Sequence, residues 1–109
     1  MRVLLDEDIP VGLRLYFRSE VEVETVEYRG WKGLKNGELL RVAQRHFDVL
    51  VTMDDNLPYQ QPVRQFDLAV AVLRTSSEAL DDLIQVVPEL ERVLSRIRPG
   101  QVVRVFPAG

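Results

Sequence analysis

The sequence predicts a three-layer α/β/α sandwich built around a mainly parallel five-stranded sheet. Five short apolar runs alternate with segments whose apolar residues recur at helical spacing, which is typical of parallel strands joined by helical crossovers. The run at residues 68–73 is continuously apolar, as expected for a central parallel strand covered on both faces. A chain of 109 residues is long enough for one core, so we expect a single domain over residues 1–109.

The first predicted elements are a strand, a helix and a second strand. The apolar residues 3–5 are typical of a short buried strand. Pro10 suits the first turn of a helix, where its missing N–H costs nothing, and we expect that helix to reach about Ser19. Valines and glutamates alternate from residue 21, which predicts a second strand over residues 21–26 at an edge of the sheet.

The middle of the chain predicts a loop, a helix and a third strand. Residues 28–35 form a loop rich in glycine and basic side chains. Asn36 is a favourable N-cap for the next helix, whose apolar residues extend to Phe47. Residues 48–52 are the third predicted strand, and a short helix is expected at residues 63–65.

The last third of the chain predicts a long helix and the remaining strands. Ser76 or Ser77 is expected to cap that helix, and Pro88 predicts a kink or a division into two helices. Residues 68–73 supply the fourth strand, and residues 102–106 supply the fifth. If the strands lie in the order 2-1-3-4-5, the topological switch point falls between strands one and three, where open α/β sheets bind ligands.

Composition excludes several classes of function. The apolar fraction of 46% and charged fraction of 28% are typical of a soluble globular protein. A net charge of −3 gives no overall attraction to nucleic acid or anionic lipid. The absence of cysteine excludes disulfides and thiolate chemistry, and the single histidine, His46, supports no Ser/His/Asp set. Without an apolar run of about 18 residues or a signal peptide, we expect no membrane segment and a cytoplasmic location.

Acidic residues follow the two strands that flank the predicted switch point. Asp6 comes directly after the first strand, and Asp54 lies two residues past the third. Because the carboxyl ends of parallel strands meet at one edge, we expect both side chains at the ligand-binding edge. The alternative is that Asp6, Glu7 and Asp8 cap the following helix and that Asp54 belongs to a turn. Asp8 is better placed for capping, and Asp55 is expected to be solvated.

Glu38 is the third candidate carboxylate. It lies in the first turn of the second predicted helix, which the chain enters from the same edge of the sheet. Carboxylates that converge repel one another unless protons or a cation intervene. Oxygen ligands with retained waters suit Mg²⁺ or Mn²⁺, which can activate water and stabilise charge on a phosphoryl group. Glu38 could instead complement the helix dipole, and the sequence favours this role and the metal-site role about equally.

The loop before Glu38 is the candidate nucleic-acid contact. Arg29, Lys32 and Lys35 could hold phosphates, and Trp31 could stack on a base. The two glycines of this loop would allow close approach of the backbone or movement. The alternative is a solvated turn with Trp31 partly buried in the core.

Four motifs together carry a resemblance to a known family. They are a strand followed by Asp-Glu-x-x-Pro at residues 3–10, Gly-Trp-Lys-Gly at 30–33, Glu-Leu-Leu at 38–40, and a strand ending in Thr-x-Asp at 49–54. With these motifs the chain resembles the short PIN-like family over most of its length. These are small prokaryotic proteins, often suspected to be toxins of toxin–antitoxin pairs. PIN domains are three-layer α/β folds, and many are Mg²⁺- or Mn²⁺-dependent ribonucleases that use clustered acids.

The resemblance implies roles for particular residues. Asp6 and Asp54 match the two metal-binding aspartates, and Glu38 matches the acid in the second helix. Asn56 stands where the family usually has a further aspartate, so it could orient water or metal through its carbonyl oxygen but adds no charge. Asn36 likewise replaces a position that is often acidic. An RNA substrate, an antitoxin partner and a homodimer are the implied binding partners.

Two other hypotheses compete with a ribonuclease. A non-catalytic module that binds an antitoxin or a second copy is motivated by the acid missing at Asn56. A phospho-receiver domain also carries acids after strands one and three, and Thr75 follows strand four. That site requires a lysine after the last strand, where this chain has Phe106 and Pro107.

Overall fold

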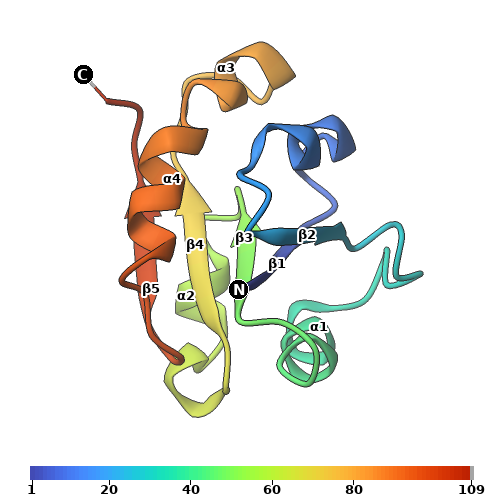
Figure 1. The fold of residues 1–109 in the computed structure, drawn as a ribbon. Coiled ribbons are helices and arrows are strands. Elements are labelled where there is room, and N and C mark those ends of the chain that lie inside the picture. The colour runs from blue at the N-terminus through green and yellow to red at the C-terminus, as the bar shows by residue number, and fades with distance from the viewer. Residues whose placement is uncertain (109) are drawn as a thin grey trace.

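Five parallel strands form one sheet at the centre of the molecule (Figure 1). The structure is a computed structural model that describes residues 1–108. The strands are β1 (Arg2–Leu5), β2 (Glu22–Thr25), β3 (Val49–Thr52), β4 (Ala69–Leu73) and β5 (Val102–Val105). Their spatial order is β2-β1-β3-β4-β5, which confirms the predicted order and places the switch point between β1 and β3.

Helices cover both faces of this sheet and complete the predicted three-layer sandwich. They are the 3-10 helices η1 (Val11–Tyr16) and η2 (Val63–Gln65) and the α-helices α1 (Asn36–Ala43), α2 (Leu57–Gln60), α3 (Leu80–Ile84) and α4 (Val87–Leu94). The first face packs against η1, α3 and α4, and the second against α1, α2 and η2. Within residues 1–108, no helix is both long enough and apolar enough to cross a membrane.

Alternation along each strand divides the core between the two faces. In β1, Leu5 packs with the first-face helices, whereas Leu4 packs with the second-face helices. In β3, Val51 packs with the first-face helices and Leu50 with the second-face helices. Successive side chains of a strand point to opposite faces, so Thr52 points to the same face as Leu50. A buried polar residue therefore ends the central strand.

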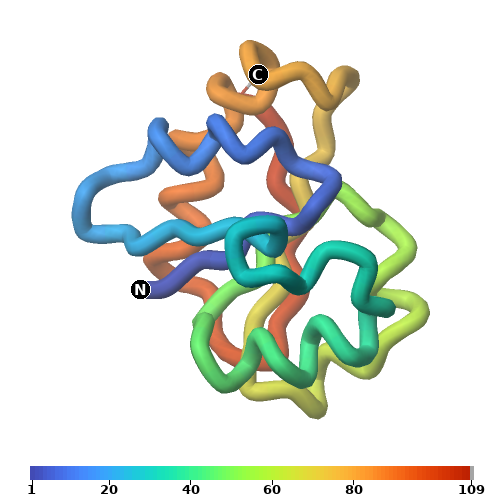
Figure 2. Tube along the Cα trace, turned by 90° about the vertical axis from the view of Figure 1, so that its right-hand side faces the viewer, coloured from blue at the N-terminus to red at the C-terminus, as the bar shows by residue number. Residues whose placement is uncertain are grey.

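The first predicted helix is shorter and tighter than expected. It is a 3-10 helix that ends at Tyr16, so the prediction that it reaches Ser19 is wrong. Gly12 near its start disfavours an α-helix and lets η1 approach α3 closely, since a Cβ at Gly12 would lie 3.3 Å from Leu80 Cδ2. Figure 2 shows η1 and α3 at the same end of the molecule.

Two predicted helix caps are also wrong, each because the side chain bonds elsewhere. The N-cap of α1 is Lys35, while Asn36 is the first residue of the helix. The N-cap of α3 is Ala79, and the Ser77 hydroxyl instead accepts a hydrogen bond from the Ala79 N–H at 3.0 Å. Pro88 lies in the first turn of α4, which confirms that two helices replace one long helix.

Candidate functional site

Asp6 and Asp54 lie at the carboxyl edge of the sheet, on either side of the switch point. β1 and β3 are parallel neighbours in which Leu5 lies opposite Val51. The Asp6 N–H donates to the Val51 carbonyl at 2.9 Å, so Asp6 continues the pairing of the two strands. The structure therefore places both acids at the edge where the sequence predicts them.

The hydroxyl of Thr52 connects the acids at this edge. It donates to Asp6 Oδ2 at 2.7 Å and lies 3.3 Å from Asp8 Oδ2. It also accepts a hydrogen bond from the Asp54 N–H at 3.0 Å. Thr52 is fully buried, so its hydroxyl is shielded from water and its partners are fixed by the fold. We call Thr52, Asp6, Asp8 and Asp54 the acid cluster.

Asp6 is a nearly buried carboxylate held by two donors. Its side chain accepts from the Thr52 hydroxyl and from the Glu7 N–H at 2.8 Å. Only 7% of the residue is exposed. Burial raises the pKa of Asp6 above its ordinary value, although the hydrogen bonds from Thr52 and Glu7 oppose this shift. A nearby positive charge would therefore stabilise this site.

Asp8 belongs to the acid cluster, although the sequence favoured a capping role for it. The turn after β1 directs the Asp8 carboxylate toward the end of β3, where Oδ2 accepts from the Met53 N–H at 3.1 Å. Oδ1 is buried and has no hydrogen-bond partner among residues 1–108. Burial, and then repulsion from Asp6, raise the pKa of Asp8 to about 6. The unpaired oxygen and the raised pKa both indicate an uncompensated negative charge.

Replacing Asp8 with asparagine is expected to stabilise the metal-free protein at neutral pH. The Asp8 carboxyl has a pKa of about 6 in the folded chain and about 3.8 in the unfolded chain. The folded state therefore binds the proton more tightly, and this group lowers stability progressively between about pH 4 and pH 6. Because the side chain is only partly buried, we expect Asp8→Asn to raise the free energy of unfolding by about 1–2 kcal/mol at pH 7.5, and by much less near pH 4.

Urea denaturation at both pH values, with EDTA present, measures this effect. Asp67→Asn is the matched control, because Asp67 is exposed and lies before β4, at the opposite edge of the sheet. An Asp8→Asn gain of the same size at pH 4 and pH 7.5 would show that the charge of Asp8 is not its cause.

Asp54 is held by two asparagines in different ways. The side-chain amide of Asn36, at the start of α1, donates to Asp54 Oδ2 at 3.2 Å. The main-chain N–H of Asn56 donates to Asp54 Oδ1 at 2.9 Å. The Asn56 side chain is exposed and makes no hydrogen bond within residues 1–108. Asn36, predicted as a helix cap and as the replacement of an often acidic residue, therefore helps to position Asp54.

Glu38 does not complete a three-carboxylate centre with Asp6 and Asp54 in this structure. It lies in the first turn of α1, as predicted, but its side chain is exposed. Among residues 1–108, no three acidic or histidine side chains surround a position that could hold a metal ion. The acids of the cluster are instead held by Thr52, by Asn36 and by main-chain N–H groups.

Arg29, predicted to contact phosphate, is engaged within the protein. Its Nε and Nη2 donate to the two carboxylate oxygens of Glu24 at 2.8 Å and 3.2 Å. Its guanidinium carbon lies 4.9 Å from the centre of the Phe47 ring and 5.4 Å from that of Trp31. Trp31 is half-buried and packs against the core of the second face. Both side chains therefore stabilise the loop, and the alternative that Trp31 is partly buried in the core is confirmed.

Lys32 is the basic residue of this loop that lies beside the acids. It lines a small crevice of about 30 Å³ together with Asp6 and Glu7, which is enough space for a water molecule. Lys35 is exposed and makes no salt bridge among the described residues. Gly33 adopts a φ of +87°, which favours glycine, and its N–H donates to Glu7 at 3.2 Å. The loop is thereby fastened to the acidic edge.

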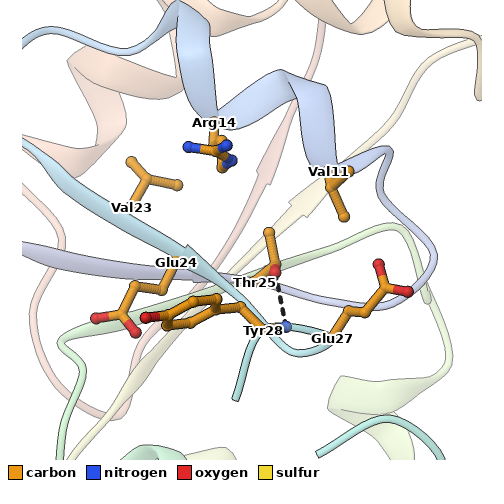
Figure 3. Close-up of a pocket in the computed structure, with 7 residues that line it drawn as sticks. All are labelled: Val11, Arg14, Val23, Glu24, Thr25, Glu27 and Tyr28. Atoms are coloured by element: carbon orange, nitrogen blue, oxygen red, sulfur yellow. Dashed lines mark hydrogen bonds between the residues drawn. The ribbon is translucent and has the colours of Figure 1, made fainter. Parts of the chain in front are cut away.

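A larger hollow of about 540 Å³ lies along the outer edge of β2. Figure 3 shows Arg14 of η1 on one side of it and Tyr28, in the turn after β2, on the other. Thr25 lies between them, and its hydroxyl accepts a hydrogen bond from the Tyr28 N–H at 3.0 Å. The hollow shares Val11, Thr25 and Glu27 with the crevice beside Asp6. The two spaces are therefore adjacent.

The fold and this edge together define an open, parallel α/β protein with one buried and two partly buried acids at its switch point. No protein-family model, no curated protein and no solved structure matches the chain. Function is therefore inferred from the residues and their geometry.

Proposed function

We propose that the protein is a PIN-like, metal-dependent endoribonuclease of the kind that serves as the toxin in toxin–antitoxin pairs. The observation that carries the proposal is the contact of the Thr52 hydroxyl with the Asp6 and Asp8 carboxylates and with the main-chain N–H of Asp54, at the switch point of the sheet. Ligands of open α/β sheets bind at such points. The motifs that resemble the PIN-like family fall at the same residues and support the same function.

The acid cluster fits a hard divalent cation by its chemistry. All its charged donors are carboxylate oxygens, and Asp8 Oδ1 is buried without a partner. Mg²⁺ commonly keeps several waters and is bound through one or two carboxylates plus the phosphates of the substrate. A preformed centre of three acids is therefore not required. Asp6 and Asp54 would hold Mg²⁺ or Mn²⁺ directly, with Asp8, Glu38 and Asn56 as proposed partners of its waters.

Bound at this edge, such an ion lowers the pKa of water and stabilises charge on a phosphoryl group. The residues of the chain supply orientation. Thr52 fixes the carboxylate of Asp6, and Asn36 fixes that of Asp54. Lys32, which lines the crevice beside Asp6, offers a positive charge to a phosphate.

RNA cleavage in the presence of Mn²⁺ tests the proposal. We expect the wild-type protein to cleave single-stranded RNA with Mn²⁺ and to lose this activity in EDTA. Asp54→Asn is expected to reduce the cleavage rate on the order of 100-fold or more, because loss of even an outer partner of a metal ligand costs about 10–100-fold. The substitution preserves an oxygen that can accept from the Asn56 N–H, so the fold should persist.

Asp67→Asn is the control for this assay, since it removes one acid at the opposite edge of the sheet. It should cleave at the wild-type rate. Equal cleavage by wild type and Asp54→Asn would contradict the proposed role of the acid cluster.

A non-catalytic module that binds an antitoxin or a second copy of the chain is the second candidate. The hollow beside β2 favours it, because Val11 and Tyr28 on its walls are exposed, Tyr28 by 80%. Exposed apolar side chains around a hollow are common at binding surfaces. Calorimetric titration with Mn²⁺ separates the two candidates. The ribonuclease must bind Mn²⁺ at millimolar concentration, whereas the non-catalytic module has no need to bind it.

A further inference from the structure

A second charged group lies at the same edge of the sheet, beyond the acid cluster. Asp55 Oδ2 lies 2.8 Å from Arg74 Nη1, and Arg104 Nε donates to Asp55 Oδ1 at 3.0 Å. Asp55 follows β3, Arg74 directly follows β4, and Arg104 lies within β5. Three neighbouring strands thus bring one carboxylate and two guanidinium groups together. We call Arg74 and Arg104 the arginine pair.

The arginine pair carries more positive charge than Asp55 can neutralise. Two guanidinium groups share one carboxylate, and neither forms a salt bridge to another acid within residues 1–108. Each guanidinium has five N–H donors, of which the contacts with Asp55 occupy a minority. Arg104 Nη2 is buried and has no partner among the described residues. Arg74 is 41% exposed at its side chain and can therefore reach an external anion.

The pairing of the strands fixes where the arginine pair lies relative to the acids. Thr52 is opposite Val72 in the β3–β4 pair, and Val72 is opposite Arg104 in the β4–β5 pair. Thr52 and Arg104 are therefore level with each other and two strands apart, a backbone separation of roughly 10 Å. Asp54 of the acid cluster and Asp55 are also consecutive in the chain. The acid cluster and the arginine pair thus lie next to each other along the same edge of the sheet.

An exposed aromatic ring accompanies the arginine pair. The guanidinium carbon of Arg104 lies 5.3 Å from the centre of the Tyr59 ring. Tyr59 lies in α2, and 78% of it is exposed. Proteins that bind single-stranded nucleic acid combine positive charge along the backbone with exposed aromatic rings on which bases stack. Tyr59 and the arginine pair supply both kinds of contact.

We propose that the arginine pair binds a backbone phosphate of single-stranded RNA, and that an adjacent base stacks on Tyr59. This inference rests on the proposed ribonuclease function, because it places one nucleotide beside the acid cluster. Asp55 then acts as an internal competitor of the phosphate for the two guanidinium groups. The site also explains how a chain of net charge −3 can hold RNA, since the attraction is local.

Fluorescence anisotropy with a labelled single-stranded RNA, in EDTA, tests the site without cleavage. Arg74→Gln is expected to weaken binding about tenfold and to make its salt dependence less steep by about one unit of log–log slope. Tyr59→Leu should weaken binding about fivefold or more, through the lost stacking. Asp55→Asn should tighten binding severalfold, because it removes the competing carboxylate. Arg96→Gln, at an exposed arginine after α4, should bind like the wild type.

Thermal melts of each variant establish that it is folded before its binding is compared. The inference is overturned if Arg74→Gln binds RNA as tightly as the wild type, or if Arg74→Gln and Arg96→Gln weaken RNA binding equally. It is also overturned if the wild type does not bind RNA. Binding of Asp55→Asn that is no tighter than wild type also counts against it. RNA binding that depends on Arg74, without cleavage in Mn²⁺, would overturn only the ribonuclease. Mn²⁺-dependent cleavage with RNA binding unaffected by Arg74 would overturn only this site.

Discussion

Replacing Thr52 with valine is expected to lower the free energy of unfolding by about 2–4 kcal/mol at pH 7.5. Valine has nearly the same shape, so the change is mainly the loss of the hydroxyl. Asp6 then loses its closest donor, at 2.7 Å, while it remains buried, and a hydrogen bond to a charged group contributes about 1.5–3 kcal/mol. The Asp54 N–H also loses its acceptor, which adds about 1 kcal/mol.

The loss in Thr52→Val should become smaller as the pH falls from 7.5 to 4.5, because the hydroxyl stabilises mainly the charged form of Asp6, whose pKa burial raises above its ordinary value. Chemical denaturation at the two pH values measures the difference. Thr25→Val is the matched control, since Thr25 is also buried at the end of a strand but only accepts one hydrogen bond, from the Tyr28 N–H. That control should lose about 1 kcal/mol at both pH values. Equal losses in the two variants would show that Thr52 does not support the acids.

Replacing Leu50 with alanine should cost about 3–5 kcal/mol of unfolding free energy. Leu50 is fully buried in the middle of β3 and packs against the helices of the second face. Truncation removes apolar contacts and leaves a cavity that a sheet paired on both sides cannot close. Domains of this kind have a total stability of about 5–15 kcal/mol. The variant should therefore lose a large part of its stability.

Leu15→Ala is the control for the core substitution. Leu15 lies in η1 and is 69% exposed, so the same chemical change there should alter stability by less than about 0.5 kcal/mol. Urea denaturation of both variants gives the comparison. A loss below about 1 kcal/mol for Leu50→Ala would contradict the close packing between β3 and the second-face helices.

The sheet could be predicted from the sequence because strand burial and strand order follow from simple patterns. The continuously apolar β4 and the alternating β2 indicated a central and an edge strand, and the structure has both in these positions. Helix ends were less predictable. Asn36 has the side chain of a good cap, but a nearby carboxylate competes for its amide. Such competition depends on residues that are distant in sequence.

The acid cluster was only partly predictable for the same reason. Asp6 and Asp54 could be placed because each follows a strand by a fixed, short distance. Asp8 could not, because its direction depends on how the turn after β1 folds back toward Met53. Thr52 offered a signal that was available in the sequence, namely a polar residue on the buried side of a central strand. A buried hydroxyl beside strand-end acids is a reasonable candidate for their common donor.

Charge pairing was the least predictable feature. The sequence pointed to Arg29 because it lies in a basic loop, yet Glu24 and two aromatic rings already engage it. Arg74 and Arg104 are far apart in sequence, and only the order of the strands brings them to one carboxylate. Asp55, expected to be solvated, is the residue that joins them.

The shared direction of the five strands places the turns that lead into strands away from the acid cluster. Every chain segment that leaves a strand does so at the edge of the sheet that carries the acid cluster, whereas segments that enter strands lie at the opposite edge. The exposed turn at Arg45 and His46, which leads into β3, is of the second kind. Inserted residues or a fused peptide should therefore be tolerated there. The turn at Gly100 is less tolerant, since its φ is +84° and an added Cβ would lie 3.3 Å from the Arg64 carbonyl oxygen.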